Sequence, residues 1–207
     1  MNQLNITAEE LAYWYFRLNG FLTIQNFIVH DKRKANQRTD VDILGVRFPF
    51  RSEIGIVDDA YFTEYSPKPL YILTEVKTGL CNLNGPWTKP EDENMQRVLG
   101  SLGALEESLI PEASKSLYEK GFYENDESRV NLICIGKSVN ESVKSSFPDV
   151  PQILLNDILK FIWLRFKNYH EQKKAHQQWD QNGKDLWALY DSNRNDIVSF
   201  IKSIEIT

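Results

Sequence analysis

Two carboxylates and one lysine occupy positions from which they could share a site. Glu75 and Lys77 end an apolar run that begins at Leu70, and Asp42 lies in an earlier segment rich in β-branched residues. Because side chains alternate between the two faces of a strand, Glu75 and Lys77 emerge on one face and Val76 on the other. If Asp42 belongs to a neighbouring strand, its carboxylate can meet Glu75 across the sheet.

Two adjacent carboxylates are ligands that a hard divalent cation prefers. Mg²⁺ binds oxygen, keeps several waters and is usually held by one or two carboxylates together with phosphate oxygens of a substrate. Such an ion polarises a phosphoryl oxygen and delivers a hydroxide-like water. Lys77 could position that water or stabilise the charge that grows on phosphorus. Asp42, Glu75 and Lys77 therefore predict a phosphodiester hydrolase that uses Mg²⁺, with Mn²⁺ as a substitute.

The alternative is an ordinary salt bridge between Glu75 and Lys77 on a solvent-facing strand. A bare Glu-x-Lys is expected on the order of once by chance in a chain of this size. The surrounding elements make it more informative, because an apolar strand leads into it and amphipathic helices lie before and after it.

Periodicity and turn residues predict the elements that position these side chains. Thr7 and Glu10 form a Thr-x-x-Glu capping box at the start of the first helix, and Asn19-Gly20 ends it. The predicted elements are a helix over about 7–19, strands over 21–30, 39–46 and 70–77, a helix over 91–109, a strand over 130–135, and helices over 153–174 and, in two parts, 185–204.

This order resembles the PD-(D/E)xK nuclease superfamily, the restriction-endonuclease-like fold that includes Holliday junction resolvases. The likeness covers about residues 7–136 and depends on Val-Asp42-Ile-Leu and Thr-Glu75-Val-Lys77. It implies an α/β fold with an αβββαβ core, a mixed central sheet flanked by helices, and cleavage of DNA. In that superfamily the Asp and the Glu bind Mg²⁺ and the Lys serves catalysis. These roles fall on Asp42, Glu75 and Lys77, with the backbone carbonyl of Val76 as a further metal ligand.

The resemblance implies two further site residues and leaves alternatives open. A glutamate on the first helix often joins the site; Glu10 is the match, its capping box is an equally good explanation, and Glu9 is the alternative. Gln96 matches a glutamine that many of these nucleases place near the site, although an ordinary exposed helix residue explains it as well. Asp40 shares the face of Asp42 and is an alternative ligand.

DNA, the implied partner, needs a local basic surface, because the chain as a whole carries a formal net charge of −5. Residues 160–184 contain six basic and two acidic side chains, a local net charge of +4. This window is the best candidate for holding a phosphate backbone, and a solvated helix face is the alternative. The candidate nucleic-acid-binding residues are Lys160, Arg165, Lys167, Lys173 and Lys174.

Composition and missing motifs narrow the remaining classes. The 207 residues are 42% apolar, and no stretch approaches the ~20 consecutive apolar residues of a membrane helix, so no membrane partner is expected. The first residues show no basic region followed by an apolar one, which favours a cytoplasmic protein. Glycine-rich phosphate loops and a Gly-x-Ser-x-Gly elbow are missing.

We expect a single nuclease-like domain over 1–207, with a core over about 7–155 and a helical C-terminal extension over about 156–207. A homodimer, which would cut both strands of a duplex, stays open. The competing function is a catalytically inactive member of the same fold that binds nucleic acid or protein.

Overall fold

The structure is a computed structural model that describes residues 3–30, 37–51, 57–63, 67–175 and 180–207. The strands are β1 (Leu4–Ile6), β2 (Leu22–His30), β3 (Gln37–Arg47), β4 (Leu70–Val76), β5 (Phe122–Glu124), β6 (Arg129–Gly136), β7 (Gln152–Leu154) and β8 (Ile204–Ile206). The helices are α1 (Ala8–Leu18), α2 (Ala60–Thr63), α3 (Gly85–Thr88), α4 (Asn94–Leu102), α5 (Ile110–Lys120), α6 (Glu141–Ser146), α7 (Leu155–Asn168), α8 (His170–Lys174), α9 (Gln181–Ser192) and α10 (Ile197–Lys202). Two short 3₁₀ helices, η1 (Pro90–Asp92) and η2 (Glu107–Leu109), lie on either side of α4.

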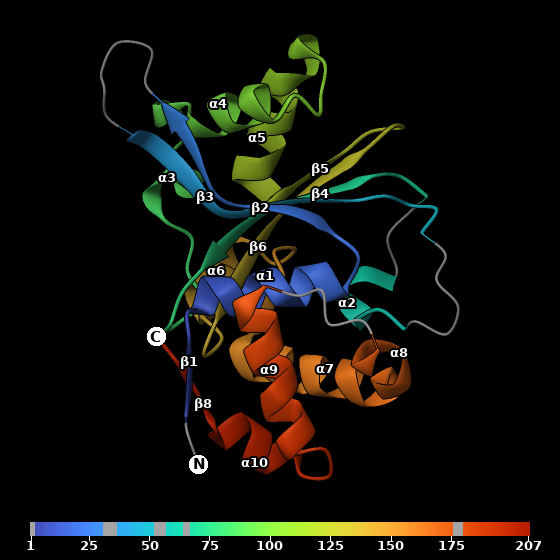
Figure 1. The fold of residues 1–207 in the computed structure, drawn as a ribbon. Helices are drawn as coiled ribbons and strands as arrows, with labels where there is room; N and C mark the ends of the chain where they lie inside the picture. The colour runs from blue at the N-terminus through green and yellow to red at the C-terminus, as the bar shows by residue number, and fades with distance from the viewer. Residues whose placement is uncertain (1–2, 31–36, 52–56, 64–66, 176–179) are drawn as a thin grey trace.

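The central sheet is mixed. Its strands follow the order β2-β3-β4-β6-β5, and β7 pairs with the last residues of β6, which β5 does not reach. β2, β3 and β4 are antiparallel neighbours, β4 and β7 run parallel to β6, and β5 runs antiparallel to it. Helices lie on both faces of this sheet, with α4 and α5 on one side and α1, α7 and α9 on the other (Figure 1). The prediction of an α/β fold with a mixed central sheet flanked by helices is thus confirmed.

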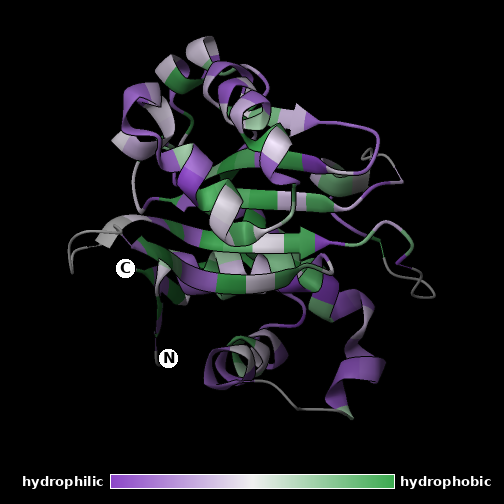
Figure 2. Cartoon of the chain, turned by 90° about the horizontal axis from the view of Figure 1, so that it is seen from above, coloured by the Kyte–Doolittle hydropathy of each residue, from purple (hydrophilic) through white to green (hydrophobic). Residues whose placement is uncertain are grey.

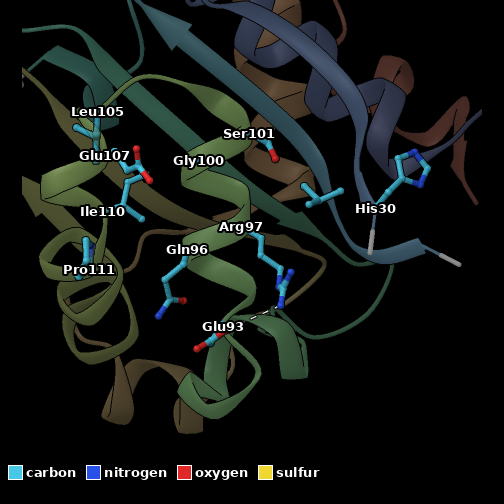
Figure 3. Close-up of a pocket in the computed structure, with 11 residues that line it drawn as sticks. His30, Glu93, Gln96, Arg97, Gly100, Ser101, Leu105, Glu107, Ile110 and Pro111 are labelled. Atoms are coloured by element: carbon cyan, nitrogen blue, oxygen red, sulfur yellow. Dashed lines mark ion pairs between the residues drawn. The ribbon is translucent and has the colours of Figure 1, made fainter. Parts of the chain in front are cut away.

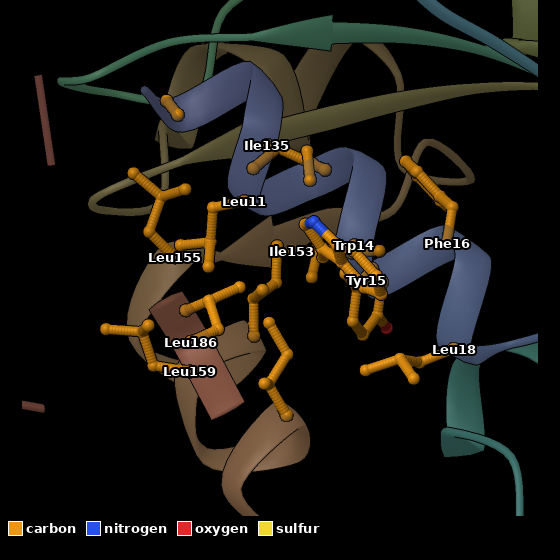
Figure 4. Packing of buried hydrophobic residues seen from close by; sticks show 14 of the residues in the cluster. Leu11, Trp14, Tyr15, Phe16, Leu18, Ile135, Ile153, Leu155, Leu159 and Leu186 are labelled. Carbon is orange, nitrogen blue, oxygen red and sulfur yellow. The ribbon is translucent and has the colours of Figure 1, made fainter. Parts of the chain in front are cut away.

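Each face of the sheet is covered by its own hydrophobic cluster. The first cluster joins the sheet to α1 and α7, and Trp14 and Tyr15 lie at its centre (Figure 4). The second joins the opposite face to α3, α4 and α5 through residues such as Trp87 and Met95. Seen from above, hydrophobic residues run along the strands, and the helices show more hydrophilic residues (Figure 2). No helix in the described ranges is long and apolar enough to cross a membrane.

Strong periodicity located most elements. The helix predicted over 7–19 is α1, and Thr7 and Glu10 form the predicted capping box. The four predicted strands correspond to β2, β3, β4 and β6. The helix predicted over 91–109 is wrong in extent: α4 ends at Leu102 because Gly103 adopts φ +67°, the left-handed geometry of a helix C-cap. The helix predicted over 153–174 is also wrong in extent, because residues 152–154 form β7 and α7 ends at Asn168.

The C-terminal helices share the core with the N-terminal part of the chain. α7 packs against α1, and its Ile158 and Ile162 belong to the same cluster as Trp14. β1 pairs in parallel with β8. The backbone N–H of Ala8 donates to the carbonyl of Thr207 (3.2 Å), so the last residue holds the first turn of α1.

Arg165 does not lie on a DNA-binding surface, which corrects the expectation from local charge. Its side chain is 3% exposed, and Nη2 donates to the carbonyl of Val57 (2.7 Å) and lies 3.4 Å from Oδ1 of Asp58. Arg47 and Arg51 pair with the same carboxylate. Burial lowers the pKa of Arg165, and the charge of Asp58 opposes that shift. Arg165 therefore anchors the segment before β4 to α7.

Replacement of Asp58 should destabilise the protein strongly, because it leaves the buried guanidinium of Arg165 without its counter-charge. We expect Asp58→Ala to lower the free energy of unfolding by about 2–4 kcal/mol in urea denaturation. Asp157→Ala is the control, because Asp157 pairs with Lys160 at the surface, and its loss should be below about 1 kcal/mol. Equal losses in the two variants would show that the Asp58 cluster contributes no more than a surface pair.

Candidate active site

The Asp42 carboxylate is joined to the Glu-x-Lys segment by a hydrogen bond. The ladder between β3 and β4 ends at Ile43 opposite Thr74, so Asp42 lies beyond the last ladder pair. There Oδ2 of Asp42 accepts a hydrogen bond from the backbone N–H of Val76 (2.7 Å). On the other side of β4, the N–H of Lys77 donates to the carbonyl of Ile135 in β6 (2.9 Å). The segment is thus held from both neighbouring strands.

The path of the chain around Asp42 is irregular. Val41 and Ile43, two residues apart, pack into the clusters on opposite faces of the sheet. In β2, Asn26 lies between the residues paired with them and has φ +50°, a left-handed geometry that asparagine tolerates. The two strands therefore change face together. This change allows the Asp42 side chain to reach β4 instead of standing perpendicular to the sheet.

Glu75 is buried and surrounded by hydrogen-bond donors. Its side chain is 3% exposed. Oε1 accepts from Nζ of Lys77 and from Nδ2 of Asn84, and Oε2 accepts from Nε1 of Trp87 (2.6 Å). Asn84 and Trp87 are site residues that sequence reasoning missed. The Asn-Gly-Pro run indicates a helix start, since Pro86 stands in the first turn of α3, but it does not reveal the contact with Glu75.

Burial disfavours the charged forms of both carboxylates, and neighbouring negative charge disfavours them further. Burial raises the pKa of Asp42 above its usual range; the amide of Val76 and the charge of Lys77 oppose this shift. Burial also raises the pKa of Glu75, and the charge of Asp42 raises it further against the hydrogen bond from Lys77. The two groups therefore interact electrostatically, and a cation between them would relieve the repulsion.

The structure distinguishes between the three acidic residues that the sequence offered as further site residues. Glu9 acts on Asp42 electrostatically and raises its pKa, as Asp40 does more weakly. The carboxylate of Glu10 accepts from the N–H of Thr7 (3.0 Å), so Glu10 is engaged in the capping box. Asp40 is exposed. Glu9 is consequently the first-helix acid whose charge reaches the site.

Gln96 is not brought into contact with the carboxylates. It lies on α4, half-buried, and the described residues show no hydrogen bond between it and Asp42, Glu75 or Lys77. It lines a cavity between α4, α5 and β2 instead.

The predicted basic window lies on α7 and α8, across the sheet from the α3 helix that covers Glu75. Lys160 and Lys174 pair with Asp157 and Glu171, and Nζ of Lys167 lies 4.8 Å from the ring centre of Trp163. Lys173 is half-buried on α8, and residues 176–179 of the window lie outside the described part of the chain. Two of the five candidate residues, Lys160 and Lys174, are therefore already paired with carboxylates of their own helices.

The residues around Asp42 provide a hard-cation ligand set of modest size. The carboxylates of Asp42 and Glu75, both with raised pKa values, are ligands that suit Mg²⁺ or Mn²⁺. The carbonyl of Val76 is an additional oxygen in the same segment. The described residues contain no group of three or more His, Cys, Asp or Glu side chains arranged to hold a metal. A bound ion would therefore depend on two carboxylates, backbone oxygen, water and substrate oxygens.

No protein-family model, curated protein or solved structure matches the chain. Its function must therefore be inferred from the chemistry of the site.

Two substitutions of Asp42 separate its charge from its hydrogen bond. Asp42→Asn keeps an acceptor for Val76, whereas Asp42→Ala leaves that N–H unsatisfied. We expect Asp42→Ala to be less stable than Asp42→Asn by about 1–3 kcal/mol in thermal or urea unfolding. Equal stability of the two variants would rule out a structural role for this hydrogen bond.

The same pair has a predictable pH dependence in EDTA. The raised pKa of Asp42 means that the folded state binds more protons than the unfolded state just above the ordinary value of 3.8. The contribution of Asp42 to wild-type stability should therefore fall as the pH rises through that window. Asp42→Asn should be more stable than wild type at pH 7, and this difference should vanish below pH of about 4.

Proposed function

We propose that this protein is a metal-dependent nuclease that hydrolyses DNA phosphodiester bonds at Asp42, Glu75 and Lys77. The observation that carries the proposal is the hydrogen bond between Asp42 and Val76, which brings a second carboxylate to the middle of the Glu-x-Lys segment. The order α1, β2, β3, β4, α4 and β6 is compatible with the αβββαβ core of the PD-(D/E)xK superfamily, and that finer fold is part of the proposal.

Each residue has a role that follows from its contacts. Asp42 and Glu75 would hold Mg²⁺ or Mn²⁺, together with the carbonyl of Val76. The ion supplies Lewis-acid activation of a phosphoryl oxygen and a more acidic water. Lys77 is 30% exposed in its side chain and shares the Glu75 carboxylate, so its ammonium can turn toward a phosphate and stabilise developing charge. Trp87 and Asn84 orient Glu75 by donating hydrogen bonds to it.

One observation favours a second candidate, the catalytically inactive module of the same fold. Both oxygens of Glu75 already accept hydrogen bonds from side chains, and the group is nearly inaccessible to solvent. Metal binding would therefore require Lys77 or Asn84 to release Oε1. If neither does, the cluster is a structural polar network and the protein binds its partner without cutting it.

Cleavage assays distinguish the two candidates. Labelled single-stranded, duplex and four-way-junction DNA would be incubated with Mg²⁺, Mn²⁺ or EDTA. We expect cutting that requires the metal and that falls by at least about 100-fold in Asp42→Asn, Glu75→Gln and Lys77→Ala, with far-ultraviolet circular dichroism unchanged. Asp40→Asn is the matched control and should retain activity, because Asp40 is exposed. Wild-type protein that binds no Mn²⁺ by calorimetry and cuts no substrate would support the inactive module.

Adjacent glutamates on α1 supply a second matched pair. Glu9→Gln removes a charge that acts on Asp42 and should change the metal concentration required for half-maximal cleavage. Glu10→Gln weakens the capping box, so the thermal midpoint should fall by an amount equivalent to about 1 kcal/mol or less while the metal requirement stays the same. The reverse result would assign the site to Glu10.

A further inference from the structure

A cavity of about 1100 Å³ lies between α4, the beginning of α5 and the end of β2 (Figure 3). Its size is slightly above the range for small-molecule sites, ~300–1000 Å³. One part of its wall is apolar and contains Leu105 and Ile110. Its polar part contains Gln96, Arg97 and Ser101 along α4, together with His30 and the acidic side chains of Glu93 and Glu107. The lining thus suits a ligand with an apolar body and a polar, charged end.

Gln96 and Arg97 are incompletely satisfied. Oε1 of Gln96 and Nε of Arg97 are buried and have no hydrogen-bond partner within the described ranges. The guanidinium of Arg97 lies 3.8 Å from a carboxylate oxygen of Glu93, whose side chain is 68% exposed. That distance is at the outer limit of an ion pair, so a phosphate could replace Glu93 at low cost. A ligand in the cavity would supply the partner that each of these atoms lacks.

The two side chains leave α4 in different directions, so they can hold different parts of one ligand. Consecutive helix residues are separated by about 100° around the helix axis. Figure 3 shows Gln96 on the side of α4 toward α5, and Arg97 on the opposite side of the helix axis. Gln96 offers an amide to the edge of a nucleobase, Ile110 and Leu105 offer apolar contacts to its face, and Arg97 offers a guanidinium to its phosphate. A nucleotide combines these three chemical features.

The cavity lies near the candidate active site and on the same face of the sheet. Val29 lines the cavity and belongs to the hydrophobic cluster that also contains Trp87, the partner of Glu75. Val29 is three residues along β2 from Asn26, the residue level with Asp42, which corresponds to about 10 Å at ~3.3 Å per residue. The cavity wall at Val29 is therefore offset from the level of Asp42 by a length that one DNA strand can span.

We propose that this cavity binds an unpaired nucleotide of the substrate strand, close to the phosphate that is cut. A base within a duplex is stacked and paired and cannot reach the apolar walls, so the cavity selects DNA with a single-stranded segment. The inference rests on the proposed nuclease function for its account of the substrate. The binding itself needs neither metal nor hydrolysis.

The test measures binding in EDTA by fluorescence anisotropy, with a fluorescein-labelled single-stranded 12-mer and the corresponding 12-base-pair duplex as probes. The variants are Arg97→Ala and Gly100→Phe. Gly100 lines the cavity, and a Cβ there would make an ordinary 3.7 Å contact with Ile110, so a larger side chain can fill the space. Arg194→Ala is the matched control, since Arg194 pairs with Asp191 outside the cavity. Thermal midpoints confirm that each variant is folded.

The expected result is single-strand binding that is stronger than duplex binding and about tenfold weaker in Arg97→Ala and Gly100→Phe, with Arg194→Ala unchanged. Free deoxynucleoside monophosphate should compete with the labelled strand. Undetectable binding, equal binding of both probes, or no effect of either cavity variant would overturn the inference. Cleavage lost in Asp42→Asn but unaffected by the cavity variants would leave the nuclease proposal intact and remove this one. Strand binding in the cavity without any metal-dependent cutting would support this inference and overturn the nuclease proposal.

Discussion

The hydrogen bond from the Val76 amide to the Asp42 carboxylate is the constraint on which the site depends. In a continued antiparallel ladder, a backbone carbonyl of β3 would accept that N–H. Here a side chain takes its place, at the point where β2 and β3 change face. The sheet thereby loses a ladder bond and gains a carboxylate fixed beside Glu75. The backbone of β3 and β4 thus sets the positions of Asp42 and of the Glu-x-Lys segment. It holds the two carboxylates more precisely than two freely rotating side chains could.

The environment of Glu75 is compatible with two opposite roles. Three donors satisfy its carboxylate, and satisfied networks of this kind rigidify a core. The same donors fix the orientation of a metal ligand. Neighbouring charge distinguishes the two roles. The charge of Asp42 raises the pKa of Glu75, and the charge of Glu9 raises the pKa of Asp42, and a purely structural network needs neither. Repulsion that folding tolerates without apparent structural benefit is typical of functional sites.

Sequence patterns predicted local features well and long-range partners poorly. Alternation and helical spacing located α1, β2, β3, β4 and β6, and the facing of Glu75 and Lys77 followed from period two alone. The capping of Glu10 was also readable, since its partner is three residues away. Arg165 was misassigned because its partner, Asp58, is 107 residues distant, and a count of charges cannot detect a buried pair. Trp87 was missed for a similar reason, because its indole meets Glu75 only after α3 folds back over the sheet.

The pairing of β1 with β8 couples two parts of the sequence that are far apart. Leu4 pairs with Ile204, and the N–H of Ala8, in the first turn of α1, donates to the carbonyl of Thr207. Glu9 follows Ala8, and its charge acts on Asp42. The start of the helix that carries this charge is therefore held by a two-stranded sheet that is separate from the central one. A substitution in β8 would act on the electrostatics of Asp42 through the position of α1, without changing β3 or β4.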